Sequence, residues 1–288
     1  MAVVERVGVV GCGLMGSGIA EVCARAGLDV AVVEAHPEAL EAGAARIETS
    51  LGRAVRAGKL DEAERDSALG RLSFSTELDR LADREVVIEA IVEAEGPKTE
   101  LFAALDSVVE SPDVVLASNT SSIPIMKLAM ATGRPDRVIG IHFFNPVPVM
   151  RLVEVVPSLL TSDEAEADAN RFAEEVLDKR VVRSQDRAGF VVNALLIPYL
   201  LSAVRMYESG FASAEDIDAG MVLGCGHPMG PLALTDLIGL DTTIAVAESL
   251  YEEFREQLYA PPPLLSRMTE AGLFGRKSGR GFFEYPPR

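Results

Sequence analysis

The sequence predicts an α/β protein with an N-terminal doubly wound sheet and a C-terminal domain made only of helices. In the first half of the chain, short apolar runs alternate with helix-length amphipathic segments, which is the rhythm of consecutive βαβ units. The runs are rich in Val and Ile without polar alternation, as expected of parallel strands buried on both faces. Beyond residue 186 only helical patterns follow. We therefore expect two domains, over residues 1–186 and 187–288.

The elements of the first domain follow from this pattern in order. The apolar runs predict strands over residues 7–10, 30–33, 86–91, 114–117 and 138–143. Helices are expected between them, over residues 16–26, 38–56 and 99–109. Another apolar segment, 152–156, follows a turn-prone Asn-Pro-Val-Pro sequence and is expected to fold back against the strand at 138–143.

The second domain is predicted from helix start and stop signals. The first helix covers about 189–208, with a bend at Pro198. Ser213 and Asp216 indicate a capping box at the start of the next helix, and Gly224 is a suitable stop. Asp241 is expected to cap a helix over 242–258. Three prolines then precede a last short helix that ends at residue 272.

Composition excludes several classes of function. The formal net charge of −17 argues against nucleic acid and anionic membranes as partners. No apolar run approaches the ~20 residues needed to span a bilayer. The three scattered cysteines suit a reducing compartment, and no signal-peptide pattern is present, so we expect a cytoplasmic protein. No spacing typical of a metal site occurs, so no metal is predicted.

A glycine-rich turn follows the first predicted strand. Gly11, Gly13 and Gly16 form a GxGxxG pattern that opens a helix at Leu14 and Met15, which is typical of a Rossmann-type dinucleotide site. The first glycine permits the tight turn, the second allows close approach of a pyrophosphate, and the third allows helix and strand to pack. The helix N-terminus supplies amides and partial positive charge to the anion.

Glu34 follows the second predicted strand, 23 residues after the first glycine of the pattern. An acid about 20 residues on binds the adenosine ribose in such sites. Its carboxylate would repel a 2′-phosphate, and no arginine follows directly, so NAD is favoured over NADP. The alternative is an acid that merely ends a strand at the surface.

His142 closes an apolar strand, and Glu154 stands alone in an apolar segment that is expected to lie beside it. The preceding strand ends in the small polar residues 118–122, which should share the same crevice because ligands bind beyond the carboxyl ends of such strands. A carboxylate beside an imidazole fixes its tautomer and favours its charged form, which suits a general base. The alternative is a hydrogen-bonded histidine in the core.

These motifs resemble the L-3-hydroxyacyl-CoA dehydrogenase family, and most of all its single-function bacterial 3-hydroxybutyryl-CoA dehydrogenases. The likeness covers nearly the whole chain in the right order. Its motifs are SNTSS at 118–122, HFFNP at 142–146, LVEV at 152–155, GFVVN at 189–193, HPMGP at 227–231, GLDT at 239–242 and KSGRGF at 277–282.

The resemblance implies an NAD-dependent oxidation of a (S)-3-hydroxyacyl-CoA, with 3-hydroxybutyryl-CoA as the expected substrate, or the reverse reaction. It implies that His142 is the acid/base, that Glu154 is its partner, and that Ser121 and Asn193 bind the substrate oxygen. It also implies a homodimer formed through the helical domain. The residues that it places around NAD are Glu34, Glu93, Lys98, Asn119, Ser121, Asn145 and Lys277.

Residues 44–60 form a basic segment in an otherwise acidic chain. They include Arg46, Arg53, Arg56 and Lys59 against one acid, Glu48. We expect Arg46 and Arg53 to bind the phosphates of CoA. The alternative is a solvated helix face, which charge runs usually are.

Other functions are weighed against this one. The β-hydroxyacid dehydrogenases need a catalytic lysine after the cofactor domain, but the second domain contains only Lys277. A dehydrogenase that acts on a substrate carried by acyl carrier protein is kept as an alternative. A non-catalytic nucleotide-binding or structural relative is disfavoured because Ser121, His142, Glu154 and Asn193 are all present.

Overall fold

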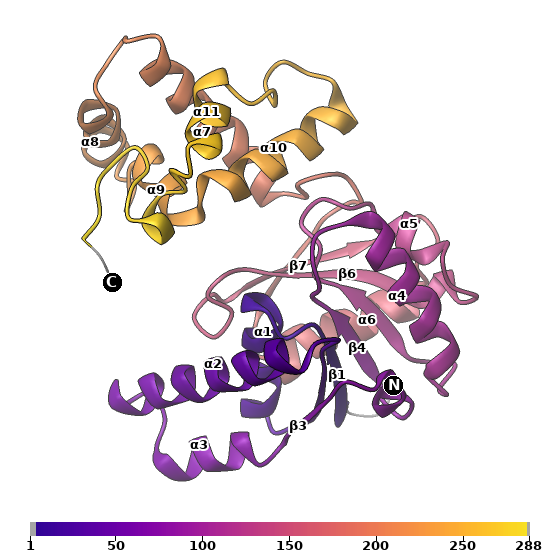
Figure 1. Cartoon of the computed structure of the whole chain (residues 1–288). Helices are drawn as coiled ribbons and strands as arrows, with labels where there is room; N and C mark the ends of the chain where they lie inside the picture. The colour runs from indigo at the N-terminus through magenta and orange to yellow at the C-terminus, as the bar shows by residue number, and fades with distance from the viewer. Residues whose placement is uncertain (1–3, 287–288) are drawn as a thin grey trace. The chain divides into compact units, whose positions relative to one another are not determined.

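The structure, a computed structural model, describes residues 4–286. The chain divides into two compact units, Met1–Arg187 and Ala188–Arg288. The first unit is built on a sheet and the second on helices, as the colouring along the chain shows (Figure 1).

The first unit contains an eight-stranded sheet in the order β3-β2-β1-β4-β5-β6-β7-β8. Neighbouring strands are parallel except β6 and β7, which are antiparallel. The predicted α/β class and the return of the chain after residue 143 are thereby confirmed. The strands are β1 (Arg6–Val10), β2 (Asp29–Val33), β3 (Leu72–Ser75), β4 (Val86–Glu89), β5 (Val115–Ser118), β6 (Val138–Phe143), β7 (Leu152–Pro157) and β8 (Arg180–Arg183).

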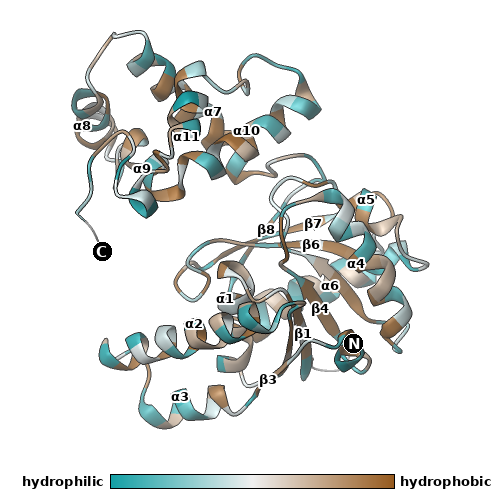
Figure 2. Ribbon diagram, viewed as in Figure 1, coloured by the Kyte–Doolittle hydropathy of each residue, from teal (hydrophilic) through white to brown (hydrophobic). Residues whose placement is uncertain are grey.

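Helices cover both faces of this sheet. Every residue of β4, β5 and β6 is buried, and successive side chains of a strand point to opposite faces, so neither face is open to water. The strands are correspondingly hydrophobic in Figure 2. The α-helices are α1 (Leu14–Arg25), α2 (Pro37–Arg56), α3 (Glu62–Leu69), α4 (Glu95–Val108), α5 (Ile125–Ala129) and α6 (Asp163–Arg171), which continues into a π-helical turn, Phe172–Val176.

The segment α3–β3 has no counterpart in the sequence-based prediction. Strand β3 lies at the edge of the sheet and is only partly buried, so it lacks the continuous apolar run of the central strands. Helix α3 does carry a readable signal. The Asp61 side chain accepts from the Glu64 amide at 2.7 Å, and the Glu64 side chain accepts from the Asp61 amide at 2.8 Å, which is a capping box.

The second unit consists of helices around a core of its own. Side chains such as Leu201, Leu232, Leu250 and Leu265 are fully buried in it. The helices are α7 (Val192–Glu208), α8 (Ala214–Cys225), α9 (Pro231–Ile238), α10 (Leu240–Phe254) and α11 (Pro263–Glu270). Within residues 4–286, none of the helices has both the length and the apolar character that a bilayer crossing requires.

Several helix ends in this unit differ from the prediction: α7 starts at residue 192 and not at 189, α10 ends at Phe254 and not at 258, and α11 ends at Glu270 and not at 272. Ser213 caps α8 as expected, accepting from the Asp216 amide at 3.1 Å. The stop is Gly226, with φ 70°, and not Gly224, because the left-handed position comes after the last helical turn. Asp241 lies inside the first turn of α10 and does not cap it, because the helix already starts at residue 240.

Candidate active site

The topology brings several polar segments to one edge of the sheet. The carboxyl ends of parallel strands β1, β2, β4, β5 and β6 lie there, and such an edge is where ligands bind in open α/β sheets. The glycine-rich turn follows β1, Glu34 follows β2, Glu89 ends β4, and residues 118–122 end and follow β5. His142 is the last but one residue of β6.

The glycine-rich turn requires glycine at two positions. Gly11 has φ 96°, and a Cβ there would lie 2.5 Å from the carbonyl oxygen of Ala90. A Cβ on Gly16 would lie 1.9 Å from the carbonyl oxygen of Gly11, so the start of α1 can only pack this closely without a side chain. A Cβ on Gly13 would meet nothing within 4 Å. The backbone at Gly13 and Leu14 is therefore open to an approaching group.

Two charged side chains hold the backbone of Cys12 in this turn. Glu34 Oε2 accepts from the Cys12 amide at 2.9 Å. Arg46 Nη1 donates to the Cys12 carbonyl oxygen at 2.9 Å and contacts Ser17 Oγ at 3.0 Å. Arg46, expected at CoA, thus contacts the glycine-rich turn, whereas Arg53 of the same helix is exposed. Met15 is partly buried just after the turn.

Ser121, His142 and Glu154 form one hydrogen-bonded line. Ser121 Oγ lies 3.0 Å from His142 Nε2, and His142 Nδ1 lies 2.8 Å from Glu154 Oε2. His142 and Glu154 face each other across β6 and β7 in the antiparallel register. The exposed fraction is 5% for His142 and 0% for Glu154, so the pair interacts away from water. The centroids of the Phe144 ring and the His142 imidazole are 4.6 Å apart.

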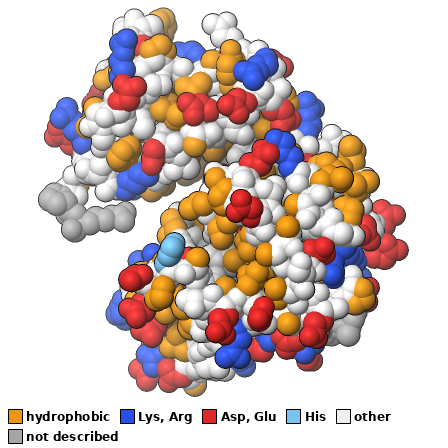
Figure 3. Space-filling view, turned by 45° about the vertical axis from the view of Figure 1, so that its right-hand side comes forward, with side chains coloured by type: hydrophobic (Ala, Val, Ile, Leu, Met, Phe, Trp, Pro, Cys, Tyr) orange, Lys and Arg blue, Asp and Glu red, His pale blue; other side chains and the backbone are white. Residues whose placement is uncertain are grey.

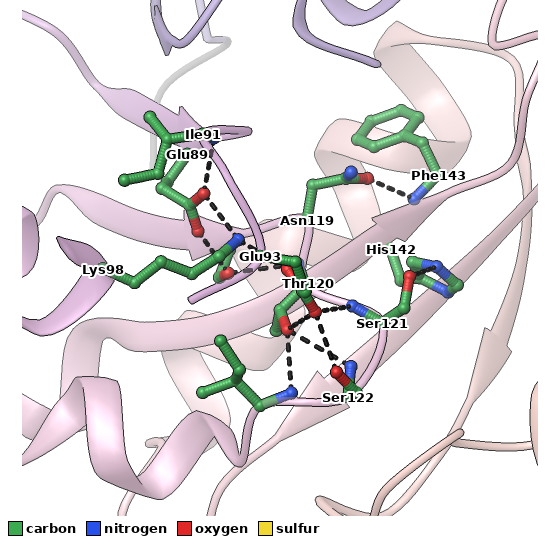
Figure 4. Close-up of polar contacts among 12 residues, drawn as sticks. Glu89, Ile91, Glu93, Lys98, Asn119, Thr120, Ser121, Ser122, His142 and Phe143 are labelled. Atoms are coloured by element: carbon green, nitrogen blue, oxygen red, sulfur yellow. Dashed lines mark hydrogen bonds and ion pairs between the residues drawn. The ribbon is translucent and has the colours of Figure 1, made fainter. Parts of the chain in front are cut away.

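Asn119 connects the ends of β5 and β6 beside this line. Its side-chain Oδ1 accepts from the Phe143 amide at 2.8 Å (Figure 4). Its own amide donates to the carbonyl oxygen of Glu89 at 2.9 Å. Asn119 is buried. Its position next to His142 agrees with the predicted grouping of the two segments.

Glu93 holds the polar segment after β5. Its Oε1 accepts from Thr120 Oγ1 at 2.5 Å, from the Ser121 amide at 2.9 Å and from Ser122 Oγ at 3.0 Å (Figure 4). Burial acts to raise the pKa of the Glu93 carboxyl, but the Lys98 ammonium and these hydrogen bonds outweigh burial and lower the pKa below its usual value. Glu93 is therefore a carboxylate acceptor at neutral pH.

Glu89 joins this group and was missed by the sequence reasoning. Lys98 Nζ lies 2.7 Å from Glu89 Oε1 and 2.9 Å from Glu93 Oε2. In the sequence, Glu89 lies inside the apolar run that is expected to form a strand over 86–91, and a lone carboxyl group in such a run was the available signal, as it was for Glu154. The strand ends at Glu89 and not at residue 91, and Glu89 lies in register with Ser118, another strand end at the same edge of the sheet.

Besides Arg53, three predicted residues lie outside these groups. Asn145 is exposed and precedes a cis peptide bond to Pro146. Asn193 and Lys277 belong to the second unit. Asn193 is in the first turn of α7, and Lys277 Nζ lies 2.5 Å from Asp241 Oδ2.

The surface of the molecule carries both acidic and basic side chains. On the face seen in Figure 3, acidic side chains are spread over both units and interspersed with basic ones. With a formal net charge of −17 as well, anionic ligands are expected to be met by local contacts on this face. Among the residues that the structure describes, no group of three or more His, Cys, Asp or Glu side chains is placed to hold a metal ion.

Comparison with known proteins identifies the family. Residues 6–187 match the NAD-binding domain of 3-hydroxyacyl-CoA dehydrogenase, and residues 189–285 match the C-terminal domain of the same family. A 3-hydroxybutyryl-CoA dehydrogenase of Mycobacterium tuberculosis is 61% identical over 98% of this chain and 99% of its own length.

Solved structures of similar proteins match this chain over nearly its whole length. The crystal structure of Mycobacterium tuberculosis FadB2 has a TM-score of 0.97 at 61% identity, over 98% of this chain and 99% of that one. The (S)-3-hydroxybutyryl-CoA dehydrogenase of Ralstonia eutropha has a TM-score of 0.93 at 46% identity, over 99% of this chain and 100% of that one. The chain therefore belongs to the 3-hydroxyacyl-CoA dehydrogenase family, with the NAD-binding domain of that family in its first unit.

Proposed function

We propose that this NAD-dependent dehydrogenase oxidises (S)-3-hydroxybutyryl-CoA to its 3-keto product, or catalyses the reverse, with His142 as general acid/base. The observation that carries the proposal is the line Ser121–His142–Glu154, with contacts of 3.0 and 2.8 Å, at the ligand-binding edge of the sheet. The substrate is proposed from the names of the relatives from Mycobacterium tuberculosis and Ralstonia eutropha.

The first unit fits NAD at the glycine-rich turn. The positive φ at Gly11, the close packing at Gly16 and the open backbone at Gly13 are what a bound pyrophosphate needs. Glu34 is held at this turn by the Cys12 amide, and we propose that it binds the adenosine ribose. When bound, NAD supplies the hydride acceptor for the substrate carbon. We propose further contacts to it from Glu93, Lys98, Asn119, Asn145 and Lys277, by likeness to the family.

His142 is proposed to take the proton of the substrate hydroxyl at Nε2. If Nδ1 carries the ring proton and donates it to Glu154, Nε2 is left as an acceptor on the side of Ser121. Glu154 then stabilises the imidazolium that forms, and it does so strongly because both side chains are shielded from water. In the reverse direction His142 returns the proton.

Ser121 is proposed to bind the substrate oxygen that His142 deprotonates. Its amide is fixed on Glu93, and its hydroxyl points at the imidazole, so the hydroxyl can orient an alcohol for proton transfer. Asn193 is proposed to assist by likeness to the family.

Two further proposals concern CoA and the partner subunit. Arg53 is exposed on α2 and is the better of the two candidates for the CoA phosphates, since Arg46 has its contacts in the glycine-rich turn. A homodimer through the second unit is supported by large apolar side chains that are exposed there in one subunit, among them Leu195, Phe211 and Leu223.

The test is to follow the absorbance of reduced nicotinamide with acetoacetyl-CoA as substrate. We expect oxidation of NADH by the wild type, much slower oxidation of NADPH, and loss of activity in His142→Ala. Binding of NADH to the variant, measured separately, controls for folding of the first unit. No turnover by a folded wild type that still binds NADH would contradict the proposed substrate and point to an acyl-carrier-protein thioester or a binding-only protein.

A further inference from the structure

Glu89 occupies a position where a carboxylate needs compensation. It is the last residue of β4, paired in register with Val10 on one side and Ser118 on the other, and its exposed fraction is 0%. A buried carboxylate is tolerated only when hydrogen bonds and an opposite charge replace water. Glu89 has both. It accepts from the Ile91 amide at 2.7 Å and from Ser118 Oγ at 2.6 Å, and it pairs with Lys98 (Figure 4).

Lys98 is shared between two carboxylates of different exposure. Its Nζ lies 2.7 Å from Glu89 Oε1 and 2.9 Å from Glu93 Oε2. The side chain of Lys98 is 1% exposed, and that of Glu93 is 41% exposed. The ammonium sits on a flexible four-carbon stem, so its buried partner decides where it lies. Glu89 therefore fixes the ammonium from the inside, and Glu93 meets it from the outer side.

Glu93 connects this ion pair to the reacting groups. Glu93 Oε1, the carboxylate oxygen that does not contact Lys98, accepts from the Ser121 amide at 2.9 Å and from the hydroxyls of Thr120 and Ser122. The Ser121 hydroxyl in turn lies 3.0 Å from His142 Nε2. A continuous series of ion pairs and hydrogen bonds thus runs from the buried end of β4 to the imidazole.

We infer that Glu89 is a positioning residue, which acts through Lys98 and Glu93 to hold the backbone of Ser121 in place for proton transfer at His142. The inference rests on the proposed function. Its physical basis is geometric, because a displacement of about 1 Å at a reacting group can lower a rate about 100-fold. A purely structural ion pair would affect stability and leave the rate unchanged.

The test compares Glu89→Gln with the wild type in two measurements. Glutamine keeps the shape of the side chain and removes its charge. Hydrogen–deuterium exchange over residues 118–123 reports on the Ser121 amide, and kcat/KM with acetoacetyl-CoA and NADH reports on the reaction. We expect faster exchange at Ser121 and a kcat/KM that is lower by about 10- to 100-fold. Wild-type protein without turnover would refute the proposed function, whereas the exchange result would still decide the role of Glu89.

Asp168→Asn is the matched control. Asp168 also belongs to a buried ion pair, with Arg137 at 3.0 Å, but it lies near the start of β6 rather than at the end that carries His142. We expect this variant to melt at a lower temperature, with wild-type exchange over residues 118–123 and wild-type kcat/KM. If Glu89→Gln shows the same result as this control, a loss of stability alone, the inference is overturned.

A second variant keeps the test decisive if Glu89→Gln does not fold. Adding Lys98→Met removes the opposite charge, so neither buried partner is left unpaired. Faster exchange at Ser121 in the double variant supports positioning of Ser121 by this buried ion pair, and wild-type exchange overturns the inference. If Glu89→Gln folds, it should change kcat/KM by less than about threefold in the Lys98→Met background, because additive behaviour belongs to independent sites. If the two substitutions lower kcat/KM by factors that multiply, Glu89 does not act through Lys98.

Discussion

The Cys12 amide donates a hydrogen bond to Glu34 at 2.9 Å, so the residue expected to bind the ribose also shapes the glycine-rich turn. Glu34 comes from the end of β2 and Cys12 from the turn after β1, two neighbouring strands. Replacing this carboxylate should therefore affect both the shape of the glycine-rich turn and the proposed contact to the ribose.

Glu34→Ala should raise the KM for NADH by about tenfold or more, because it removes a ribose acceptor worth roughly one charge-assisted hydrogen bond and releases the Cys12 amide. The ratio of kcat/KM for NADPH to that for NADH should rise, because a negative charge near the 2′-phosphate is gone. Steady-state kinetics with both cofactors measure this. Glu38→Ala, at an exposed acid in the first turn of α2, is the control and should leave both values unchanged.

Arg46→Ala and Arg53→Ala should affect different substrates. Arg46 binds the Cys12 carbonyl oxygen at 2.9 Å, so its loss should loosen the glycine-rich turn and raise the KM for NADH several-fold. Arg53 is exposed, and its loss should raise the KM for acetoacetyl-CoA and leave that for NADH unchanged. The two KM values, measured for each variant, separate the roles. An increase for acetoacetyl-CoA alone in Arg46→Ala would contradict this assignment.

Glu154→Gln should lower kcat by about 100-fold or more, because the imidazolium that forms on His142 loses its charged partner. The amide is close in shape, so binding of NADH should stay at the wild-type level. Single-turnover measurements with NADH and acetoacetyl-CoA test the effect on the chemical step. A kcat within twofold of the wild type would show that Glu154 only fills the space beside β6.

Gly43→Ala should weaken NADH binding and lower stability. A Cβ at Gly43 in α2 would lie 2.0 Å from Cys12 Sγ and 2.6 Å from the Cys12 carbonyl oxygen, so the glycine-rich turn would have to move. Gly52→Ala in the same helix is the control, because its Cβ would make only an ordinary contact, at 3.6 Å from Arg56. This control should stabilise the protein by roughly 0.5–1 kcal/mol, as alanine does in helices. Thermal melting and NADH titration distinguish the two variants.

Glu21→Gln should stabilise the protein at neutral pH and have little effect in acid. Burial raises the pKa of the Glu21 carboxyl, although hydrogen bonding to Ser50 and the charge of Arg25 act in the opposite direction. With the pKa raised in the folded state, the contribution of Glu21 to stability is complete below its usual value of 4.5 and is lost as the pH rises through the folded value. The melting-temperature gain of the variant should therefore grow with pH. A gain that is largest in acid would contradict this sign.

Much of the site could be predicted because its signals are local. The glycines need particular backbone conformations, and His142 and Glu154 stand out as polar residues in apolar segments. The family resemblance and the NAD-binding domain, inferred from these motifs and their order, are confirmed by the matches over residues 6–187 and 189–285.

The remaining parts depend on contacts that the sequence does not display. Glu89 looks like one more residue of the apolar run at 86–91 until the register shows Ser118 beside it and Lys98 folds over it from α4. Arg46 looks like part of a basic helix face until its guanidinium is seen on the turn after β1. In both cases the partner lies on a different element, and tertiary packing alone brings the two together.

The antiparallel register of β6 and β7 makes activity sensitive to errors in strand alignment. Side chains alternate between the two faces along a strand, so a slip of one residue would put Val153 or Val155 opposite His142 and turn Glu154 to the other face. There the carboxylate would be buried without the imidazole, at a cost of several kcal/mol. The connection between these strands can thus vary in length only if the alignment is preserved, and turnover becomes a sensitive reporter of correct strand pairing during refolding.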